Sequence, residues 1–260
     1  GQQALYETVK SLAPAASEGF SVTMGADGTS RAGTLDTAVE VARITGRPVT
    51  AHLTALGFSQ DQALEAADGL WEAGITRVLA LRGDWPRAVQ GSLPEGFAHA
   101  TDLVAALRER HPFEIAVAAY PEKHPEADTL DKDIEHLKEK LDAGASKAIC
   151  QFVLNPAAYA RFLDACDRHG IDAPIVPGLM PLENWARLHR FARTNGVSVP
   201  NWLDHLFSEG EQVPELLPYL SAAATIEQAR RLIGYGAQEL HVYTMNRWPL
   251  SLALAKLLGN

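Results

Sequence analysis

Residues 114–154 read EIAVAAYPEKHPEADTLDKDIEHLKEKLDAGASKAICQFVL and contain two strand-like runs with a helical stretch between them. The runs Glu114–Pro121 and Lys147–Leu154 are apolar along most of their length, whereas Leu130–Ala143 carries its apolar residues at helical spacing. Gly144 follows the helical stretch, at the position where a left-handed residue commonly ends a helix. Apolar strands separated by helices indicate a parallel sheet that is covered on both faces.

The same alternation continues toward both ends of the chain. The strand-like runs are short and rich in β-branched residues, and they are Phe20–Ala26, Pro48–Ala55, Arg77–Gly83, Glu114–Pro121, Lys147–Leu154, Pro174–Pro181 and Glu239–Asn246. The amphipathic stretches between them are Gln2–Leu12, Thr34–Thr45, Ser59–Ala73, Ala100–Arg110, Leu130–Ala143, Pro156–His169 and Leu182–Thr194. The segment Asn195–Ala229 breaks this rhythm with additional helical material. Because no long linker or change of composition divides the chain, we predict one domain over residues 1–260.

Seven predicted strands are one fewer than a closed parallel barrel needs. The chain begins on the helical stretch Gln2–Leu12, so we expect either that a first strand precedes Gly1 in the natural protein or that another segment fills the gap. The alternative is an open, doubly wound sheet. No Gly-x-Gly-x-x-Gly turn opens a helix, which weakens a nucleotide-binding fold of that type. We therefore predict an α/β fold, a (β/α)8 TIM barrel whose first strand is missing from this chain.

Composition narrows the classes of function. The net charge of −9 disfavours broad contact with nucleic-acid phosphates, although it leaves room for an anionic small ligand. Cys150 and Cys166 form no Cys-x-x-Cys pair and no histidine cluster surrounds them, so we expect reduced thiols, no metal site and a cytoplasmic protein. No apolar run approaches the roughly 18 residues of a membrane span, so we expect no membrane partner.

The carboxyl ends of the predicted strands are unusually rich in polar residues and glycine. In a parallel barrel, these ends form the working face. The residues at these ends are Thr23, His52, Arg82, Gly83, Asp84, Tyr120, Gln151, Gly178–Pro181, Asn246 and Arg247. One polar residue at a strand end is commonly a cap or a turn former, but the same feature at seven strands indicates a ligand-binding face.

Several of these residues suit a ligand and also have a structural interpretation. Gly83 lets a ligand approach the backbone, because it has no Cβ. Arg82 suits a phosphate group, or alternatively an ion pair with another side chain. Asp84 suits a developing positive charge, or alternatively a cap or turn. Gln151 offers a donor and an acceptor, which suits the edge of a pterin-like ring but equally the backbone of a loop.

Three further basic residues are ambiguous in the same way. His52 and His124 suit a phosphate or the edge of a flavin. A lone histidine, however, more often makes a structural hydrogen bond. Lys140 lies on an amphipathic helix, where a lysine is ordinarily solvated.

Several short motifs stand in the order found in one enzyme family. Two are specific in combination, namely Leu-Arg-Gly-Asp at Leu81–Asp84, within Leu79–Asp84, and Ala-Tyr-Pro-Glu-x-His-Pro-Glu-Ala at Ala119–Ala127. The other motifs are Ser21–Ala26, Ala51–Thr54, Ala73–Ile75, Leu141–Ala145, Gln151–Phe152, Pro177–Gly178 and Tyr243–Arg247. Through these motifs the chain resembles the methylenetetrahydrofolate reductases over nearly its whole length.

The resemblance implies a (β/α)8 barrel that holds FAD at the carboxyl ends of its strands. The residues that match the cofactor-binding positions are Thr23, His52, Arg82, Gly83, Asp84, Ala100, Tyr120, His124, Ala127, Asp133, His136 and Lys140. Gln151 and Arg247 match positions that contact the folate or the nicotinamide nucleotide. Asp84 matches the aspartate beside the flavin and the folate, so it is the implied catalytic residue.

The implied reaction has two steps at one site. NADH or NADPH reduces FAD, and 5,10-methylenetetrahydrofolate is then reduced to 5-methyltetrahydrofolate, which predicts ping-pong kinetics. A homo-oligomer is also expected. Two alternatives stay open, a family member that works without a tightly held flavin and a barrel that binds folate or flavin without catalysis.

The sequence departs from the bacterial family pattern at several positions. Met24 replaces a Tyr, His136 an Asn, Glu139 an Arg and Arg187 a Gln. The family's Phe-Glu-Phe-Phe-Pro-Pro strand, which carries a general-acid glutamate, is absent from the sequence. We therefore expect the acid to come from that missing strand, and we expect residues 1–260 alone to reduce folate poorly.

Overall fold

The computed structural model describes residues 2–16, 18–24, 31–83 and 96–258 of the chain. Its internal contacts divide the chain into two compact units. Unit 1 is Gly1–Ala118 with Glu139–Lys147, and unit 2 is Ala119–Lys138 with Ala148–Asn260. In both units strands alternate with helices, and neighbouring strands run parallel.

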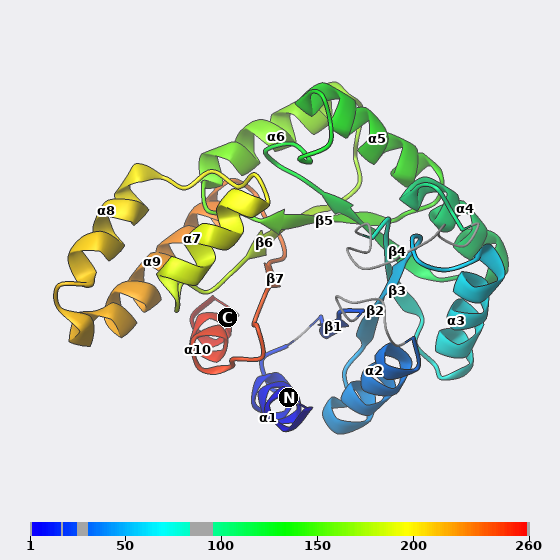
Figure 1. Cartoon of the computed structure of the whole chain (residues 1–260), viewed down its shortest axis with the longest axis horizontal. Helices are drawn as coiled ribbons and strands as arrows, with labels where there is room; N and C mark the ends of the chain where they lie inside the picture. The colour runs from blue at the N-terminus through cyan, green and yellow to red at the C-terminus, as the bar shows by residue number, and fades with distance from the viewer. Residues whose placement is uncertain (1, 17, 25–30, 84–95, 259–260) are drawn as a thin grey trace, which may run out of the picture. The chain divides into compact units, whose positions relative to one another are not determined.

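Unit 1 contains the first four strands. These are β1 (Phe20–Val22), β2 (Val49–Thr54), β3 (Arg77–Leu81) and β4 (Glu114–Ala119), and the helices are α1 (Gln2–Leu12), α2 (Arg31–Thr45), α3 (Gln60–Glu72) and α4 (Ala100–Arg110). Strands that follow one another in the chain are neighbours in the sheet, with Phe20 opposite Val49 and Arg77 opposite both Thr50 and Glu114. Helices α2, α3 and α4 lie along one side of these strands (Figure 1).

The core of unit 1 forms because its strands are apolar on both faces. In β4, Ile115, Ala116 and Val117 are each at most 3% exposed. Leu103 and Leu107 of α4 are fully buried, and their spacing of four residues places both on one face of the helix. The near-continuous apolar run of the sequence therefore corresponds to a strand that is covered on both sides.

A polar clip joins α3 to α4 at the surface of unit 1. The guanidinium of Arg110 donates two hydrogen bonds to the Asp68 carboxylate, at 2.9 and 2.6 Å. His111 Nε2 lies 2.7 Å from Asp68 Oδ1, and the His111 ring stacks on Trp71 with 5.1 Å between ring centroids. Hydrogen bonds from Arg110, and secondarily from His111, hold the pKa of Asp68 well below its usual range.

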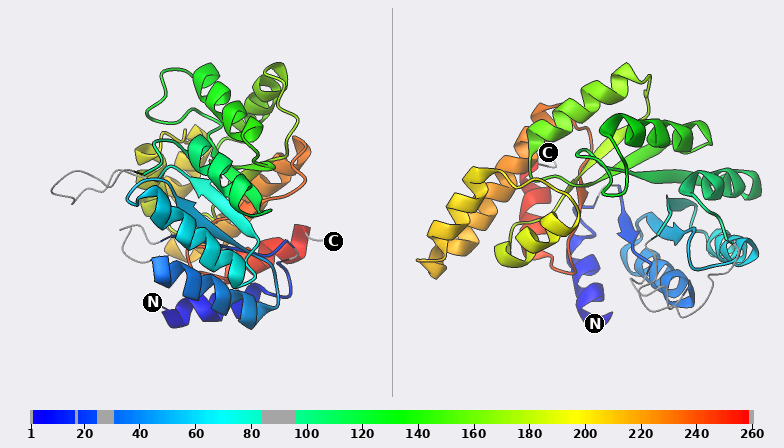
Figure 2. Two further views of the ribbon diagram at one scale, coloured as in Figure 1. Left: turned by 90° about the vertical axis from the view of Figure 1, so that its right-hand side faces the viewer. Right: turned by 45° about the horizontal axis from the view of Figure 1, so that its top comes forward.

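Unit 2 contains the remaining strands and the additional helices. Its elements are β5 (Lys147–Phe152), α6 (Pro156–Arg168), β6 (Ile175–Leu179), α7 (Trp185–Thr194), α8 (Asn201–Gly210), the 3-10 turn η1 (Pro214–Leu216), α9 (Leu217–Gly234), β7 (His241–Val242) and α10 (Pro249–Leu258). Helix α5 (Leu130–Asp142) begins in unit 2 and ends in unit 1. Ala148 lies opposite Ile175, and Gly178 lies opposite His241. Helices α8 and α9 run side by side (Figure 2).

Helix α9 holds two loops of unit 2 through buried polar side chains. The Gln228 side-chain amide donates to Leu154 O at 2.8 Å, just beyond β5. Leu182 N, beyond β6, donates to Thr225 Oγ1 at 3.0 Å. Both side chains are at most 1% exposed, and Gln228 Oε1 lacks a hydrogen-bond partner among the described residues. The loops after β5 and β6 are therefore fixed by the helix that the sequence showed as an insertion.

The fold class predicted from the sequence is confirmed. Within the described ranges, seven parallel strands alternate with helices in the manner of a (β/α)8 barrel that lacks one strand. Gly74, Gly144 and Gly170 have φ angles of 79°, 122° and 67° after α3, α5 and α6, as predicted for left-handed residues at helix ends. The additional helical material is confirmed as α8, η1 and α9. Within the described ranges, no helix is both long and apolar enough to cross a membrane.

Several predicted boundaries were wrong. The strands are shorter than predicted, and the last one ends at Val242 instead of Asn246. Met245 and Asn246 are left-handed, with φ of 50° and 56°, and Arg247 N donates to Thr244 O at 2.9 Å, so this segment is a tight turn. Helix α2 begins at Arg31, three residues before the predicted Thr34, and α10 was not predicted.

Candidate functional site

The predicted site residues divide between the two units. Unit 1 carries Thr23, His52, Arg82, Gly83, Ala100 and Lys140, and unit 2 carries Tyr120, His124, Ala127, Asp133, His136, Gln151 and Arg247. Asp84, the predicted catalytic carboxylate, lies outside the described residues. Each set is built on the carboxyl ends of strands and the segments that follow them.

In unit 1, His52 is fixed by the neighbouring strand. Its Nε2 lies 2.7 Å from Ser21 Oγ of β1, and the residue is only 9% exposed. Thr23, directly after β1, is exposed. Thr54 Oγ1 contacts Met24 Sδ at 3.3 Å, so Met24 packs against the end of β2. His52 thus has a structural partner as well as a place at the predicted face.

Gly83 is required by both its conformation and its neighbours. Its φ is 84°, and a Cβ at this position would lie 3.1 Å from Thr54 Cβ. Leu56 N donates to Arg82 O at 2.8 Å, which extends the pairing of β2 with β3 as far as Arg82. The half-buried guanidinium of Arg82 therefore projects from a backbone that the sheet holds in place.

Lys140 is not the solvated charge that its helix suggested. It is half-buried, and its Nζ donates to Ala118 O of β4 at 2.6 Å. Ala80 lies opposite Val117, so Arg82 and the carbonyl bound by Lys140 belong to the ends of two neighbouring strands. Two cationic donors at adjacent strand ends can donate charge-assisted hydrogen bonds to phosphate oxygens. Ala100 is the first residue of α4.

In unit 2, the loop after β4 brings four predicted residues together. The Tyr120 and His124 rings pack edge to face with 4.6 Å between centroids. His124 N donates to Asp133 Oδ2 at 2.8 Å, and Ala127 N donates to His124 O at 3.0 Å. His136 lies three residues beyond Asp133 on α5 and is exposed.

Gln151 borders an aromatic surface that sequence reasoning missed. Its Nε2 lies 3.5 Å from Asn195 Oδ1, and Asn195 Nδ2 donates to Phe191 O at 2.8 Å. Phe191 is 41% exposed, and its ring stacks on Phe152 with centroids 5.3 Å apart. The sequence signal was weak, because Phe191 lies beside the buried residues of α7 and resembles a core position.

Arg247 has a partner that the sequence did not reveal. Its Nε lies 2.7 Å from Glu183 Oε2. The Arg247 side chain is 60% exposed and the Glu183 side chain 19%. The cation predicted to contact the folate or the nicotinamide nucleotide is thus already paired with a mostly buried carboxylate.

These sites belong to a chain with recognisable relatives. The family model of methylenetetrahydrofolate reductase matches residues 1–259. The chain belongs to the methylenetetrahydrofolate reductase family. It is 38% identical over 258 residues to 5,10-methylenetetrahydrofolate reductase of Pectobacterium carotovorum subsp. carotovorum, covering 99% of this chain and 85% of that protein. The enzyme of the same name from Escherichia coli (strain K12) is 35% identical over 258 residues, with 99% and 86% covered.

Solved structures agree with this family at the level of the fold. An uncharacterized protein from Clostridium thermocellum that binds two copies of 5-methyl-5,6,7,8-tetrahydrofolic acid aligns with a TM-score of 0.55. The alignment covers 84% of this chain and 75% of that one at 17% identity. At that identity the likeness concerns the fold alone.

One narrow cleft of unit 2 lies between the loop after β4 and the residues next to Gln151. It is lined by Tyr120, Pro121, Glu122, Lys123, Phe152, Val153, Asn195, Gly196 and Val197. Ser198 N donates to Glu122 Oε2 at 3.0 Å, and Ser198 Oγ bonds the other carboxylate oxygen. The loop after β4 and the neighbours of Gln151 therefore border the same cleft.

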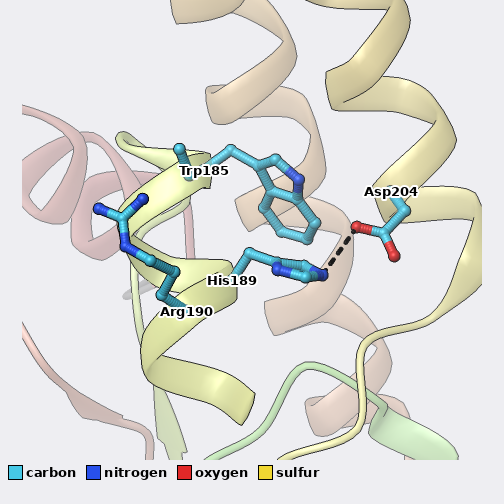
Figure 3. A pocket seen from close by; sticks show the side chains of 5 residues that line it. Trp185, His189, Arg190 and Asp204 are labelled. Atoms are coloured by element: carbon cyan, nitrogen blue, oxygen red, sulfur yellow. Dashed lines mark ion pairs between the residues drawn. The ribbon is translucent and has the colours of Figure 1, made fainter. Parts of the chain in front are cut away.

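A larger surface pocket lies apart from the predicted family residues. Its volume is about 330 Å³, and Trp185, Ala186, His189, Arg190 and Asp204 line it. Figure 3 shows His189 of α7 facing Asp204 of α8, with 3.4 Å between Nε2 and Oδ1. The Trp185 ring stacks on buried Phe207 with centroids 4.6 Å apart, so it serves the packing between these helices.

The cysteines take no part in either set. Cys150 and Cys166 are free and buried, as expected for reduced thiols. Burial raises the pKa of the Cys166 thiol to about 12 and that of Cys150 well above its usual value. Both therefore stay protonated and unreactive near neutral pH.

Proposed function

We propose that this protein reduces 5,10-methylenetetrahydrofolate to 5-methyltetrahydrofolate, with NADH or NADPH as the hydride source and FAD as the bound carrier. The observation that carries this proposal is the family match over residues 1–259. The relatives named 5,10-methylenetetrahydrofolate reductase, which align along 99% of the chain, support the same substrate.

The described donors fit a flavin dinucleotide by their chemistry. In unit 1, Arg82 and Lys140 supply cations suited to a diphosphate, and Thr23 supplies an exposed hydroxyl. In unit 2, the loop with Tyr120 and His124 offers an aromatic edge and an imidazole whose backbone is fixed. Bound FAD supplies the transfer of hydride between the nicotinamide and the folate.

Three residues of unit 2 suit the folate by their chemistry. The Gln151 amide offers a donor and an acceptor to the edge of the pterin, and the exposed Phe191 ring offers a flat apolar surface. Arg247 suits the carboxylates of the glutamate tail. Asp84, which lies outside the described residues, would by its charge offset the positive iminium that forms when the five-membered folate ring opens.

The test begins with the visible spectrum of the purified full-length protein with and without added FAD. Flavin absorbance that stays with the protein, bleaches with NADH or NADPH under anaerobic conditions, and returns with methylenetetrahydrofolate as 5-methyltetrahydrofolate accumulates supports the proposal. Folate reduction by a colourless protein would favour the flavin-independent alternative. Ligand binding without turnover would favour a non-catalytic barrel.

A further inference from the structure

Lys123 has an unusual backbone conformation in the loop after β4. Its φ is 82°, in the left-handed region that glycine and asparagine adopt most easily. Lys123 N donates to Tyr120 O at 3.1 Å and closes a turn. Local strain of this kind persists where the surrounding structure fixes it, and it is often found at functional sites.

The Lys123 ammonium turns back onto its own loop. Its Nζ donates to His124 O at 3.3 Å and also bonds Ala127 O. Ala127 N in turn donates to His124 O at 3.0 Å. The ammonium therefore spans a second turn, His124–Ala127, by holding the carbonyl at each of its ends.

This second turn sets the position of the His124 imidazole. Glu126 N donates to His124 Nδ1 at 3.1 Å, so Nδ1 acts as an acceptor. His124 N is held by Asp133 Oδ2 at 2.8 Å, and the ring lies edge to face against Tyr120. The orientation of the ring thus depends on a backbone that Lys123 clamps from within.

We propose that Lys123 is a positioning residue for the flavin, which clamps the His124–Ala127 turn so that His124 and Ala127 meet the cofactor in a fixed geometry. The inference rests on the proposed function, because it takes the flavin to bind at this loop. The ammonium acts through the backbone carbonyls of the loop, so Lys123 need not touch the phosphates itself. Preorganisation of this kind raises affinity by lowering the ordering cost of binding.

The experiment removes the ammonium while keeping a left-handed backbone accessible. Lys123→Asn and Lys123→Gly both do this, and glycine also relieves the backbone strain. Lys132→Asn is the matched control, because Lys132 lies on α5 nearby, is 61% exposed in its side chain and pairs with Glu135. The dissociation constant for FAD is measured on the full-length apoprotein by quenching of flavin fluorescence, at low and at high salt. Amide hydrogen exchange is measured on the same proteins without FAD.

The clamp predicts that both Lys123 variants raise the dissociation constant about tenfold at either salt concentration, whereas Lys132→Asn changes it less than about twofold. Exchange should quicken at the amides of Glu126 and Ala127 and stay unchanged in the core of unit 2. The melting temperature of Lys123→Gly should not fall, because its backbone is relieved of strain. A purely structural lysine would lower stability and affinity together.

Four results would overturn the clamp. These are an unchanged dissociation constant in both Lys123 variants, a loss of affinity that disappears at high salt, an exchange increase throughout unit 2, or unaltered exchange at Glu126 and Ala127. The salt-sensitive result would mean direct contact between Lys123 and the phosphates. If the wild-type protein binds no FAD, the proposed flavin function fails, and exchange at Glu126 and Ala127 still tests whether the lysine orders the loop.

Discussion

Replacement of Gly178 by alanine should destabilise unit 2 strongly, because the added methyl group has no space. A Cβ at this position of β6 would lie 2.6 Å from Cys150 O, 2.6 Å from Tyr243 Cε2 and 2.9 Å from Phe152 Cα. Real Cβ contacts essentially never fall below 3.0 Å, so neighbouring atoms must move by at least 0.4 Å. Two of the three atoms belong to the backbone of β5, which cannot rotate away as a side chain can.

The cost follows from what must move. Tyr243 cannot retreat freely, because its hydroxyl donates to Cys150 O at 3.1 Å. Overpacking in a well-packed core costs about 1–3 kcal/mol, and the backbone contacts place Gly178→Ala near 3 kcal/mol. For a chain of this size, that corresponds to a fall of roughly 6–12 °C in melting temperature.

Thermal and urea unfolding followed by circular dichroism measure this loss. Gly234→Ala is the matched control, because a Cβ at this helical position of α9 would meet nothing within 4 Å. That variant should be at least as stable as wild type, because alanine has the higher helix propensity. A Gly178→Ala protein as stable as wild type would refute the argument from close approach.

Three further predictions concern charge and hydrogen bonding. Asp68→Asn should lower the free energy of unfolding at neutral pH, because Arg110 holds the pKa of Asp68 below its value of about 3.9 in the unfolded chain. Unfolding measured at several pH values should show the difference from wild type vanish as the pH falls through the lowered pKa. Gln228→Leu should lower the free energy of unfolding in urea by about 1–2 kcal/mol, because the Leu154 carbonyl loses its hydrogen bond. An unchanged free energy would mean that this hydrogen bond does not stabilise the fold. Glu183→Gln should lower the KM for the folate about threefold, because it removes the charge that pairs with the Arg247 guanidinium. A raised KM would instead mean that the ion pair positions Arg247 for binding.

The helices and strands could be predicted from the sequence, because the faces that are buried carry apolar residues at regular spacing. The apolar residues of β4 and the helical spacing of α4 both reflect which faces are covered. The glycine after α5 was predictable for a local reason, since only a residue without Cβ takes a φ of 122° easily. The family motifs added predictions of the site residues, which periodicity alone leaves ambiguous.

The parts that failed depend on contacts between distant segments. The helical pattern around Lys140 suggested solvation, but the side chain reaches the carbonyl of Ala118, twenty-two positions earlier. The pairing of Glu183 with Arg247 depends on two loop conformations that no periodic signal encodes. Helix α10 was missed because its apolar run follows a segment that itself resembled the continuation of a strand.

The left-handed residues link these failures to function. In the part of the chain that the structure describes, the non-glycine residues with positive φ are Lys123, Met245 and Asn246. For Lys123 and Met245 this conformation costs on the order of 1 kcal/mol or more relative to an ordinary one, whereas asparagine tolerates it better. Lys123 directly precedes His124, and the turn at Met245 and Asn246 directly precedes Arg247, two residues that the sequence predicts to bind ligands. Local sequence preferences are expected to fail where a ligand site requires a particular backbone conformation. The left-handed conformations of these two turns therefore made them hard to predict, and they also favour the ligand-binding roles predicted for His124 and Arg247.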